Sequence, residues 1–216
     1  MPRQPDPGLE QRILEAASRL WARGGEKTLT MRAVAKAAGT TTPTVYERYR
    51  HRDDILHALR TETRRELFAA LSRTRTLRES VQTYLEFALE HSHAYEVLFD
   101  GVGKPPSLHE PWPSFNLMRQ RLAERRGGTP RQNTRLMLAV WSLMHGAAIL
   151  IIRGDFVGAL RTQTVHACMD AIEAIVDTVG SKRTPHSGPK WPRNLILGEG
   201  QQSRAGRNGE GKKKAR

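Results

Sequence analysis

The sequence predicts an all-α protein made of a short three-helix module followed by a larger helical domain. Apolar residues recur at steps of three and four along most of the chain. No segment alternates apolar and polar residues between hairpin turns, as strands of a sheet do. With 216 residues, the chain can build one large helical core or two modules that share an interface.

Caps and glycines define the first three helices. Asp6–Pro7 supplies a cap and a first-turn proline, and the apolar stripe that follows stops at Gly24–Gly25. Thr30 caps a second, short helix, and Gly39 can take the left-handed conformation that ends it. Thr41 caps a third helix after a turn of a few residues. Two short helices braced by a longer one are therefore expected near the N-terminus.

The rest of the chain reads as longer helices, a proline-rich loop and a basic tail. The loop is Gly101–Pro113, and it contains four prolines. From Gly180 onward, ten Lys and Arg face two Glu, a composition that cannot bury enough apolar surface to fold alone. The expected helices are Asp53–Leu71, Leu77–Phe99, Ser114–Arg126, Pro130–Arg153 and Val157–Val179.

Charge and cysteine content narrow the class of protein. The chain has 35 Lys and Arg against 22 Asp and Glu, a net charge of +13, so its natural partners are polyanions such as nucleic acid. Cys168 is the single cysteine, which excludes an internal disulfide and a multi-cysteine zinc site. The first residues lack a secretory signal pattern, and we expect a cytoplasmic protein without cofactor.

The short helices form a candidate helix-turn-helix, in which the second helix enters the major groove of DNA. Thr42, Pro43 and Thr44 lead this helix, and such small side chains let the backbone approach base edges. Tyr46 can reach a phosphate one turn later. The candidate DNA-binding residues are Thr30, Arg32, Thr41, Thr42, Pro43, Thr44, Tyr46, Arg48 and Arg52.

The run TLTMRAVAKAAGTTTPTVYERYRHRDDILHAL, residues Thr28–Leu59, resembles the signature of the TetR family of transcriptional repressors. The resemblance implies that Tyr46 contacts a phosphate and that Arg52 stands where the family usually has a phosphate-binding Lys. Arg48 replaces a common His, and Pro43 stands where Gly is frequent, which can change base preference. The resemblance also implies a homodimer whose last two helices pair with those of the partner, with an effector that releases DNA.

A second likeness lies downstream, because Trp141, His145 and Gly146 look like the Trp-x-x-x-His-Gly element of one regulatory-domain type in that family. Residues Tyr84–Phe99 are also similar to the first long helix of that domain. We expect an apolar effector pocket with a few polar groups, for a hydrophobic or aromatic small molecule. The candidate lining is Phe87, His91, Tyr95, Phe99, Met118, Met137, Trp141 and His145.

The predicted organisation has three parts. Residues 1–52 form the DNA-binding module, residues 53–179 form the helical ligand-binding and dimerisation domain, and residues 180–216 form a basic tail. The long apolar faces of the last two helices favour a four-helix dimer interface on their own account. A dimer would place two recognition helices about 34 Å apart, one DNA turn, and would bind a palindromic operator.

The roles of three features, His145, the His91/His93 pair and the long apolar run before Arg153, each allow more than one interpretation. His145 can contact a ligand or be a buried imidazole bonded to a neighbouring helix, with Gly146 serving close packing. His91 and His93 face different sides of a helix and lack a third ligand, so no metal site is expected. The apolar run Leu136–Ile152 favours a buried helix over a membrane span.

No nucleophile elbow, phosphate loop or spaced pair of catalytic carboxylates occurs, which argues against an enzyme. A helical enzyme would have only His145, with Glu90 or His91, as weak candidates. A DNA binder without sequence preference would use the same positive charge without a pocket. The tail is either a solubilising extension or an electrostatic aid to DNA binding.

Overall fold

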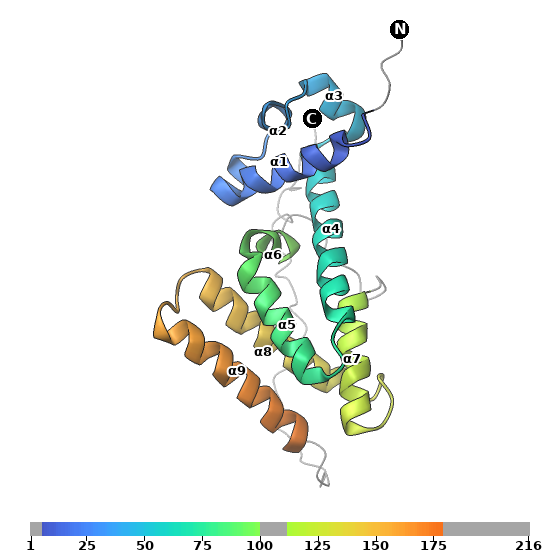
Figure 1. The fold of residues 1–216 in the computed structure, drawn as a ribbon, viewed down its shortest axis with the longest axis vertical. Helices are drawn as coiled ribbons and strands as arrows, with labels where there is room; N and C mark the ends of the chain where they lie inside the picture. Colours follow the sequence, from blue (N-terminus) through green and yellow to red (C-terminus); the bar gives the residue numbers. More distant parts are fainter. Residues whose placement is uncertain (1–5, 100–111, 179–216) are drawn as a thin grey trace, which may run out of the picture. The chain divides into compact units, whose positions relative to one another are not determined.

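The computed structural model describes residues 6–99 and 112–178, and within these ranges all regular structure is helical. The all-α prediction is confirmed (Figure 1). A single 3-10 turn, Gly25–Lys27, follows the first helix. The α-helices are α1 (Leu9–Gly24), α2 (Met31–Ala37), α3 (Thr42–Arg48), α4 (Arg52–Ser72), α5 (Leu77–Glu90), α6 (Ser92–Phe99), α7 (Pro113–Arg126), α8 (Thr134–Ile152) and α9 (Ala159–Thr178).

Helices α1 to α3 and the first turns of α4 share one hydrophobic core. Ile13 on α1, Val34 on α2 and Val45 on α3 are fully buried in it, as one apolar stripe per amphipathic helix requires. Tyr49 closes this core after α3, and its hydroxyl donates to Glu10 at 3.4 Å. Burial raises the pKa of Tyr49 to about 12, so the phenol stays neutral.

Helix α4 belongs to both cores of the described chain. Ile55 and Leu56, near its beginning, are buried in the first core, whereas Leu67 and Leu71 are buried in the second. Figure 1 shows α4 running from the α1–α3 region down to α7. One continuous helix therefore connects the two cores.

The second core is built around α5, which contacts α4, α6, α7, α8 and α9. Its buried residues include Leu85 on α5, Met144 on α8 and Ile172 on α9. Helices α8 and α9 lie side by side along one side of this core (Figure 1). Between α7 and α9, Arg125 forms ion pairs with Glu173 at 2.6 Å and Asp177 at 2.8 Å.

The expected helix Leu77–Phe99 is wrong as a single element, because the chain breaks at His91 into α5 and α6. His91 has φ −111° and ψ 43°, outside the helical region. Histidine and serine are weak helix formers, so interrupting the helix between His91 and His93 costs little helix propensity. The backbone stays bonded across it, since His91 N donates to Phe87 O and Tyr95 N donates to His91 O. The turn lets α6 contact both α1 and α4.

Other boundaries differ by a few residues. The first helix begins at Leu9, and Asp6 supports its start by accepting a hydrogen bond from Gly8 N at 3.0 Å. Pro113, expected in the loop, opens α7, where its missing N–H has no intrahelical partner to lose. The remainder of the predicted loop, residues 101–111, and the tail, residues 180–216, lie outside the described residues.

Gly146 is not needed for packing within one chain. A Cβ atom placed on it would meet no atom within 4 Å, so the expectation of close helix packing at this position is wrong for the single chain.

Helix α8 is long and apolar enough to cross a membrane by length and composition alone, and 33% of its apolar window is buried. The buried helix expected here is thus covered on one side only.

Candidate nucleic-acid interface and ligand cavity

The predicted caps hold the two short helices α2 and α3 in place. Thr30 Oγ1 accepts a hydrogen bond from Ala33 N at 3.2 Å, and Thr41 Oγ1 accepts one from Thr44 N at 3.4 Å. Gly39 has φ +67°, a left-handed conformation that favours glycine, and Thr40 N returns to Ala35 O at 3.0 Å. The turn between the helices is therefore fixed by the residues that the sequence identified.

The outer surface of α3 presents small and hydroxyl-bearing side chains. Pro43 is exposed in the first turn, and Thr42 and Thr44 are half-buried. The hydroxyl of Thr44 lies 2.8 Å from that of Thr41, so it is partly engaged within the helix start. Tyr46 is 52% exposed, which leaves its phenol available to a partner outside the chain.

Basic residues near α3 differ in their surroundings. Arg32 and Arg48 are exposed. Arg52, which opens α4, forms an ion pair with Glu26 at 2.5 Å and lies 3.6 Å from Asp53. An arginine that binds a phosphate from this position would have to exchange Glu26 for the phosphate.

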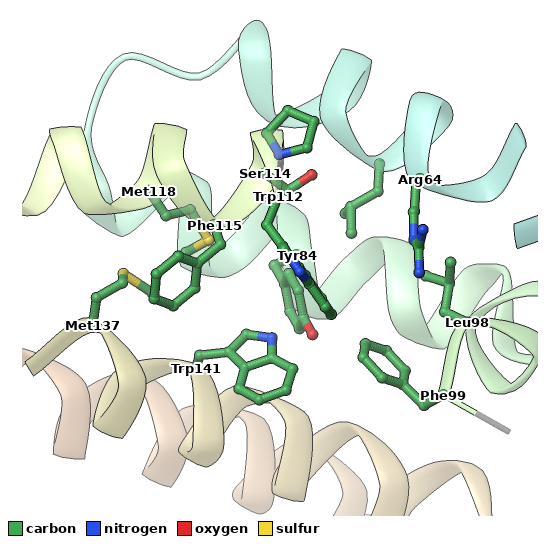
Figure 2. A pocket seen from close by; sticks show the side chains of 12 residues that line it. Arg64, Tyr84, Leu98, Phe99, Trp112, Ser114, Phe115, Met118, Met137 and Trp141 are labelled. Atoms are coloured by element: carbon green, nitrogen blue, oxygen red, sulfur yellow. The ribbon is translucent and has the colours of Figure 1, made fainter. Parts of the chain in front are cut away.

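A small cavity of about 50 Å³ lies within the second core, between α4, α5, α6, α7 and α8. Figure 2 shows its side chains, with aromatic rings from several helices around the space and Met118 and Met137 side by side. The lining consists of Arg64, Leu67, Tyr84, Leu98, Phe99, Trp112, Pro113, Ser114, Phe115, Met118, Met137 and Trp141.

The predicted pocket residues divide into two groups. Phe99, Met118, Met137 and Trp141 line the cavity. The others do not border it and fill the core beside it: Phe87 and His91 form a ring pair with centroids 4.8 Å apart, and Tyr95 and His145 lie behind the lining.

The predicted lining missed the residues that come from α4 and from the start of α7, and it also missed Tyr84 on α5 and Leu98 on α6. Arg64 stands three residues before the buried Leu67 on the same helix face, which was a usable signal. Trp112 stands among prolines, and its place against α4 and α8 could not be read from any periodicity.

A buried polar chain connects α5, α6 and α8 next to the cavity. The Tyr84 hydroxyl lies 2.8 Å from the Tyr95 hydroxyl, which lies 2.8 Å from His145 Nδ1. Burial raises the pKa of Tyr84 to about 12 and raises that of Tyr95 further, while burial lowers the pKa of His145. All three groups are therefore neutral near pH 7. Of the two readings of His145, the structure favours the imidazole bonded to a neighbouring helix.

Helix α6 joins this chain to the first core. Val97 on α6 is buried among the residues of α1 to α4 in the first core, and its carbonyl oxygen accepts a hydrogen bond from Arg60 Nε at 3.0 Å. Phe99, two residues later, lines the cavity and contacts the Trp141 and His145 rings. One short helix thus links the cavity wall to the helices that present α3.

No group of three or more His, Cys, Asp or Glu side chains suited to a metal ion occurs among the described residues. His93 Nδ1 lies 3.5 Å from Glu96 on its own helix, one turn along, as surface pairs at this spacing do.

Two family profiles match the chain. Residues 13–59 match bacterial regulatory proteins of the tetR family, and residues 77–177 match the tetracyclin repressor-like C-terminal domain. The two matches together cover well over half of the sequence; the first ends within α4 and the second begins at α5. No curated protein sequence matches the chain.

Solved structures share this fold. A protein of unknown function from Rhodococcus sp. RHA1 superposes with a TM-score of 0.64 at 22% identity, over 80% of this chain and 96% of that one. A TetR-like transcriptional regulator from the same source gives 0.58 at 19% identity, over 83% and 100%. TetR from Acinetobacter baumannii AYE gives 0.57 at 16% identity, over 81% and 96%. At these identities the likeness establishes the fold alone.

Proposed function

The chain belongs to the TetR family of transcriptional regulators, and from this premise we propose that it is a homodimeric repressor of a palindromic operator, released by an apolar or aromatic effector. Members of this family are DNA-binding transcription factors rather than enzymes, and respond to small molecules. The observation that carries the proposal is the combination of an exposed, capped helix α3 with a cavity bordered by α4, the helix shared by both cores.

The uncovered face of α8 and α9 supports the homodimer. Leu138, Leu143 and Leu150 on α8 are 36% to 48% exposed, and Leu160 on α9 is 53% exposed. Several large apolar side chains exposed on two adjacent helices favour an interface. Gly146 lies on the same side of α8 as Leu143 and Leu150, and the open space over it leaves room for a partner helix to approach. Two copies that pair these helices would cover all of these residues.

Operator reading is assigned to the recognition helix. Thr42, Pro43 and Thr44 face base edges, while Tyr46 and the arginines hold phosphates. Thr30, Arg32 and Thr41 complete the surface from the start of α2 and from the turn. In a two-fold dimer the two α3 helices meet successive major grooves about 34 Å apart, so each operator half-site repeats as an inverted copy.

Release by the effector follows from the small size of the cavity. A space of about 50 Å³ is smaller than the roughly 300 Å³ at which ligand pockets begin, so a bound effector has to part the surrounding helices. Because α4 borders the cavity and also carries Ile55 and Leu56 of the first core, parting moves the DNA-binding helices and changes the spacing between the two half-sites. A ligand acts in this way only by binding one arrangement better than the other.

We further propose a division of roles by residues: 1–52 for DNA, 53–179 for effector and dimer, and 180–216 for non-specific attraction to DNA, all in the cytoplasm where the chromosome lies. Deleting residues 180–216 is expected to leave operator choice intact and to flatten the salt dependence of affinity, since up to ten cations are removed. Loss of dimerisation on this deletion would contradict the assignment.

The decisive experiment selects bound duplexes from a random library with the purified full chain and then maps the site by footprinting. We expect one inverted repeat, protected symmetrically on both halves. A bound population without preferred sequence would show a general DNA-coating protein instead. Chromatography with light scattering of the same sample gives the number of chains per particle.

A further inference from the structure

We propose that the effector is an apolar carboxylic acid whose carboxylate pairs with Arg64 while its hydrocarbon or aromatic part fills the cavity. This inference rests on the proposed function, because it names the class of effector for the same cavity. It adds the sign of the charge and the orientation of the ligand.

Arg64 is the single charged residue among the 12 that line the cavity. It comes from α4 and is half-buried. The remaining lining is apolar or aromatic apart from two hydroxyls, those of Tyr84 and Ser114, and the Trp112 and Trp141 indoles. A cation held beside an apolar space favours an amphipathic anion.

Some other arginines in this half of the chain have carboxylate partners, whereas Arg119 donates to Asn116 and Thr134, and Arg126 donates to Asn133. Arg65, the next residue on α4, is paired with Glu62, and Arg125 is paired with Glu173 and Asp177. Within residues 6–99 and 112–178, no carboxylate lies within ion-pair distance of Arg64; its recorded contact is with the Trp112 ring, 5.6 Å from guanidinium carbon to ring centroid. A guanidinium that lies over an aromatic ring can still offer its N–H groups to a planar, two-oxygen acceptor, which a carboxylate provides.

The arrangement of side chains gives the ligand a direction. In Figure 2 the Arg64 guanidinium lies near Leu98 at one end of the cavity, whereas Met118 and Met137 lie at the opposite end. Methionine side chains are flexible and adapt to the shape of an apolar group. The carboxylate therefore lies against α4, and the hydrocarbon part runs past Tyr84 and Trp141 toward the two methionines.

A neutral or cationic effector fits the same site less well. Among the described residues no Asp or Glu lines the cavity, so an ammonium group would be buried beside Arg64 without a partner from this lining. A neutral molecule would leave Arg64 over the Trp112 ring and would gain nothing from the charge. An acid would also contact α4 directly through Arg64, and α4 contributes residues to the first core.

The test measures binding of two matched sets of probes to the full chain by calorimetry: decanoate, decanol and decylamine, and phenylbutyrate, phenylbutanol and phenylbutylamine. Within each set the apolar part is constant and the head group is anionic, neutral or cationic. We expect each acid to bind about tenfold or more tightly than its alcohol, as charged hydrogen bonds allow, and each amine to bind least.

The variant Arg64→Met keeps the length of the side chain and removes its charge. It is expected to abolish the preference for acid over alcohol while leaving the affinity for the alcohol close to that of the wild type. Arg65→Met is the matched control, since Arg65 lies next in sequence, is exposed and is paired with Glu62; it should keep the preference for acid.

Equal binding of acid and alcohol, a preference for the amine, or an acid preference that survives in Arg64→Met would each overturn the inference and leave the pocket standing. If no probe of either set binds, the effector pocket fails and the inference fails with it. Operator binding is measured separately on the same protein, so the DNA-binding part of the proposed function is judged on its own.

Discussion

The first core supports a surface that binds DNA in our proposal, whereas the second core contains the proposed effector cavity. In the region of α1 to α3 the interior is closed, with Ile13, Val34 and Val45 fully buried, and the candidate DNA-contacting side chains point outward from short helices. In the region of α5 to α9 the candidate effector site is a space left between helices. An outward surface is set by a few neighbouring residues, whereas an inner space depends on how distant helices pack.

Two arginines on α4 differ in the same way, one near the DNA-binding helices and one beside the cavity. Arg52 begins the helix and is held by Glu26 from the first region. Arg64 lies about three turns later, borders the cavity and contacts Trp112 instead of a carboxylate. One arginine has an internal anion as partner and the other faces a space, so the two are expected to respond to different ligands.

The largest expected effect concerns the uncovered face of α8. Leu143→Glu together with Leu150→Glu should convert the dimer to a monomer, because buried charges without partners oppose association, and operator affinity should fall about a hundredfold or more as the second half-site is lost. Sedimentation and operator titration check this. Phe68→Glu, an exposed apolar residue on α4, is the control and should remain dimeric; a fully dimeric double variant would place the interface elsewhere.

Truncating one residue in each core separates closed packing from packing beside a cavity. Ile55→Ala in the first core should lower the free energy of unfolding by about 2 to 5 kcal/mol, and an apolar ligand should stabilise this variant no more than it stabilises the wild type. Met118→Ala beside the cavity should cost a similar amount, yet apolar compounds should recover part of it by filling the enlarged space. Thermal and denaturant unfolding with and without phenylbutyrate makes the comparison. A ligand-induced gain in Ile55→Ala larger than that of the wild type, or no such extra gain in Met118→Ala, would contradict it.

On the outward surface, Thr44→Ala should lower operator affinity by about 1 to 3 kcal/mol and relax preference at one base pair of each half-site. Its hydroxyl also approaches Thr41, so the value is expected near the lower end. Affinity for random DNA should stay nearly unchanged. Competition between operator and scrambled duplexes measures both; an equal loss on the two would remove Thr44 from base reading.

Arg52 and Glu26 test whether the internal ion pair competes with phosphate. Arg52→Ala should weaken operator and random DNA alike and reduce the salt slope by about one per subunit. Glu26→Gln should strengthen binding to both a few-fold, because an exposed pair of this kind is worth about 1 kcal/mol or less. Titrations over a range of salt give the slopes. If Glu26→Gln leaves affinity unchanged, Arg52 does not exchange partners on binding.

The smallest effect concerns His145 and pH. Burial lowers its pKa in the folded chain, so the unfolded state binds its proton first as pH falls below about 6.5. The stability contributed by the neutral imidazole is fully present above that value and declines as pH falls toward the lowered folded pKa. His145→Gln stays neutral, and the difference in unfolding free energy between variant and wild type should shift in favour of the variant from pH 7 to pH 5. A constant difference would contradict the neutral imidazole.

Local residue patterns determined the all-α class and the frame of the first region. Thr30, Gly39 and Thr41 specify caps and a turn through bonds to residues at most five positions away, and such short-range chemistry is legible in a sequence. The beginnings and ends of most helices were predicted for the same reason, because caps, prolines and glycines act locally.

Tertiary structure alone decided where the helix break at His91, the cavity and the polar chain lie. Tyr84, Tyr95 and His145 come from three helices, and Tyr95 and His145 are separated by 50 positions; periodicity places each on a buried face without saying which neighbour it meets. The sequence could name Trp141 and Phe99 as apolar, but only the packing of α7 against both α4 and α8 brought Arg64 and Trp112 to them. The spacing of apolar residues along a helix indicates which face is buried. A cavity depends instead on the angles and distances between helices, which long-range contacts determine.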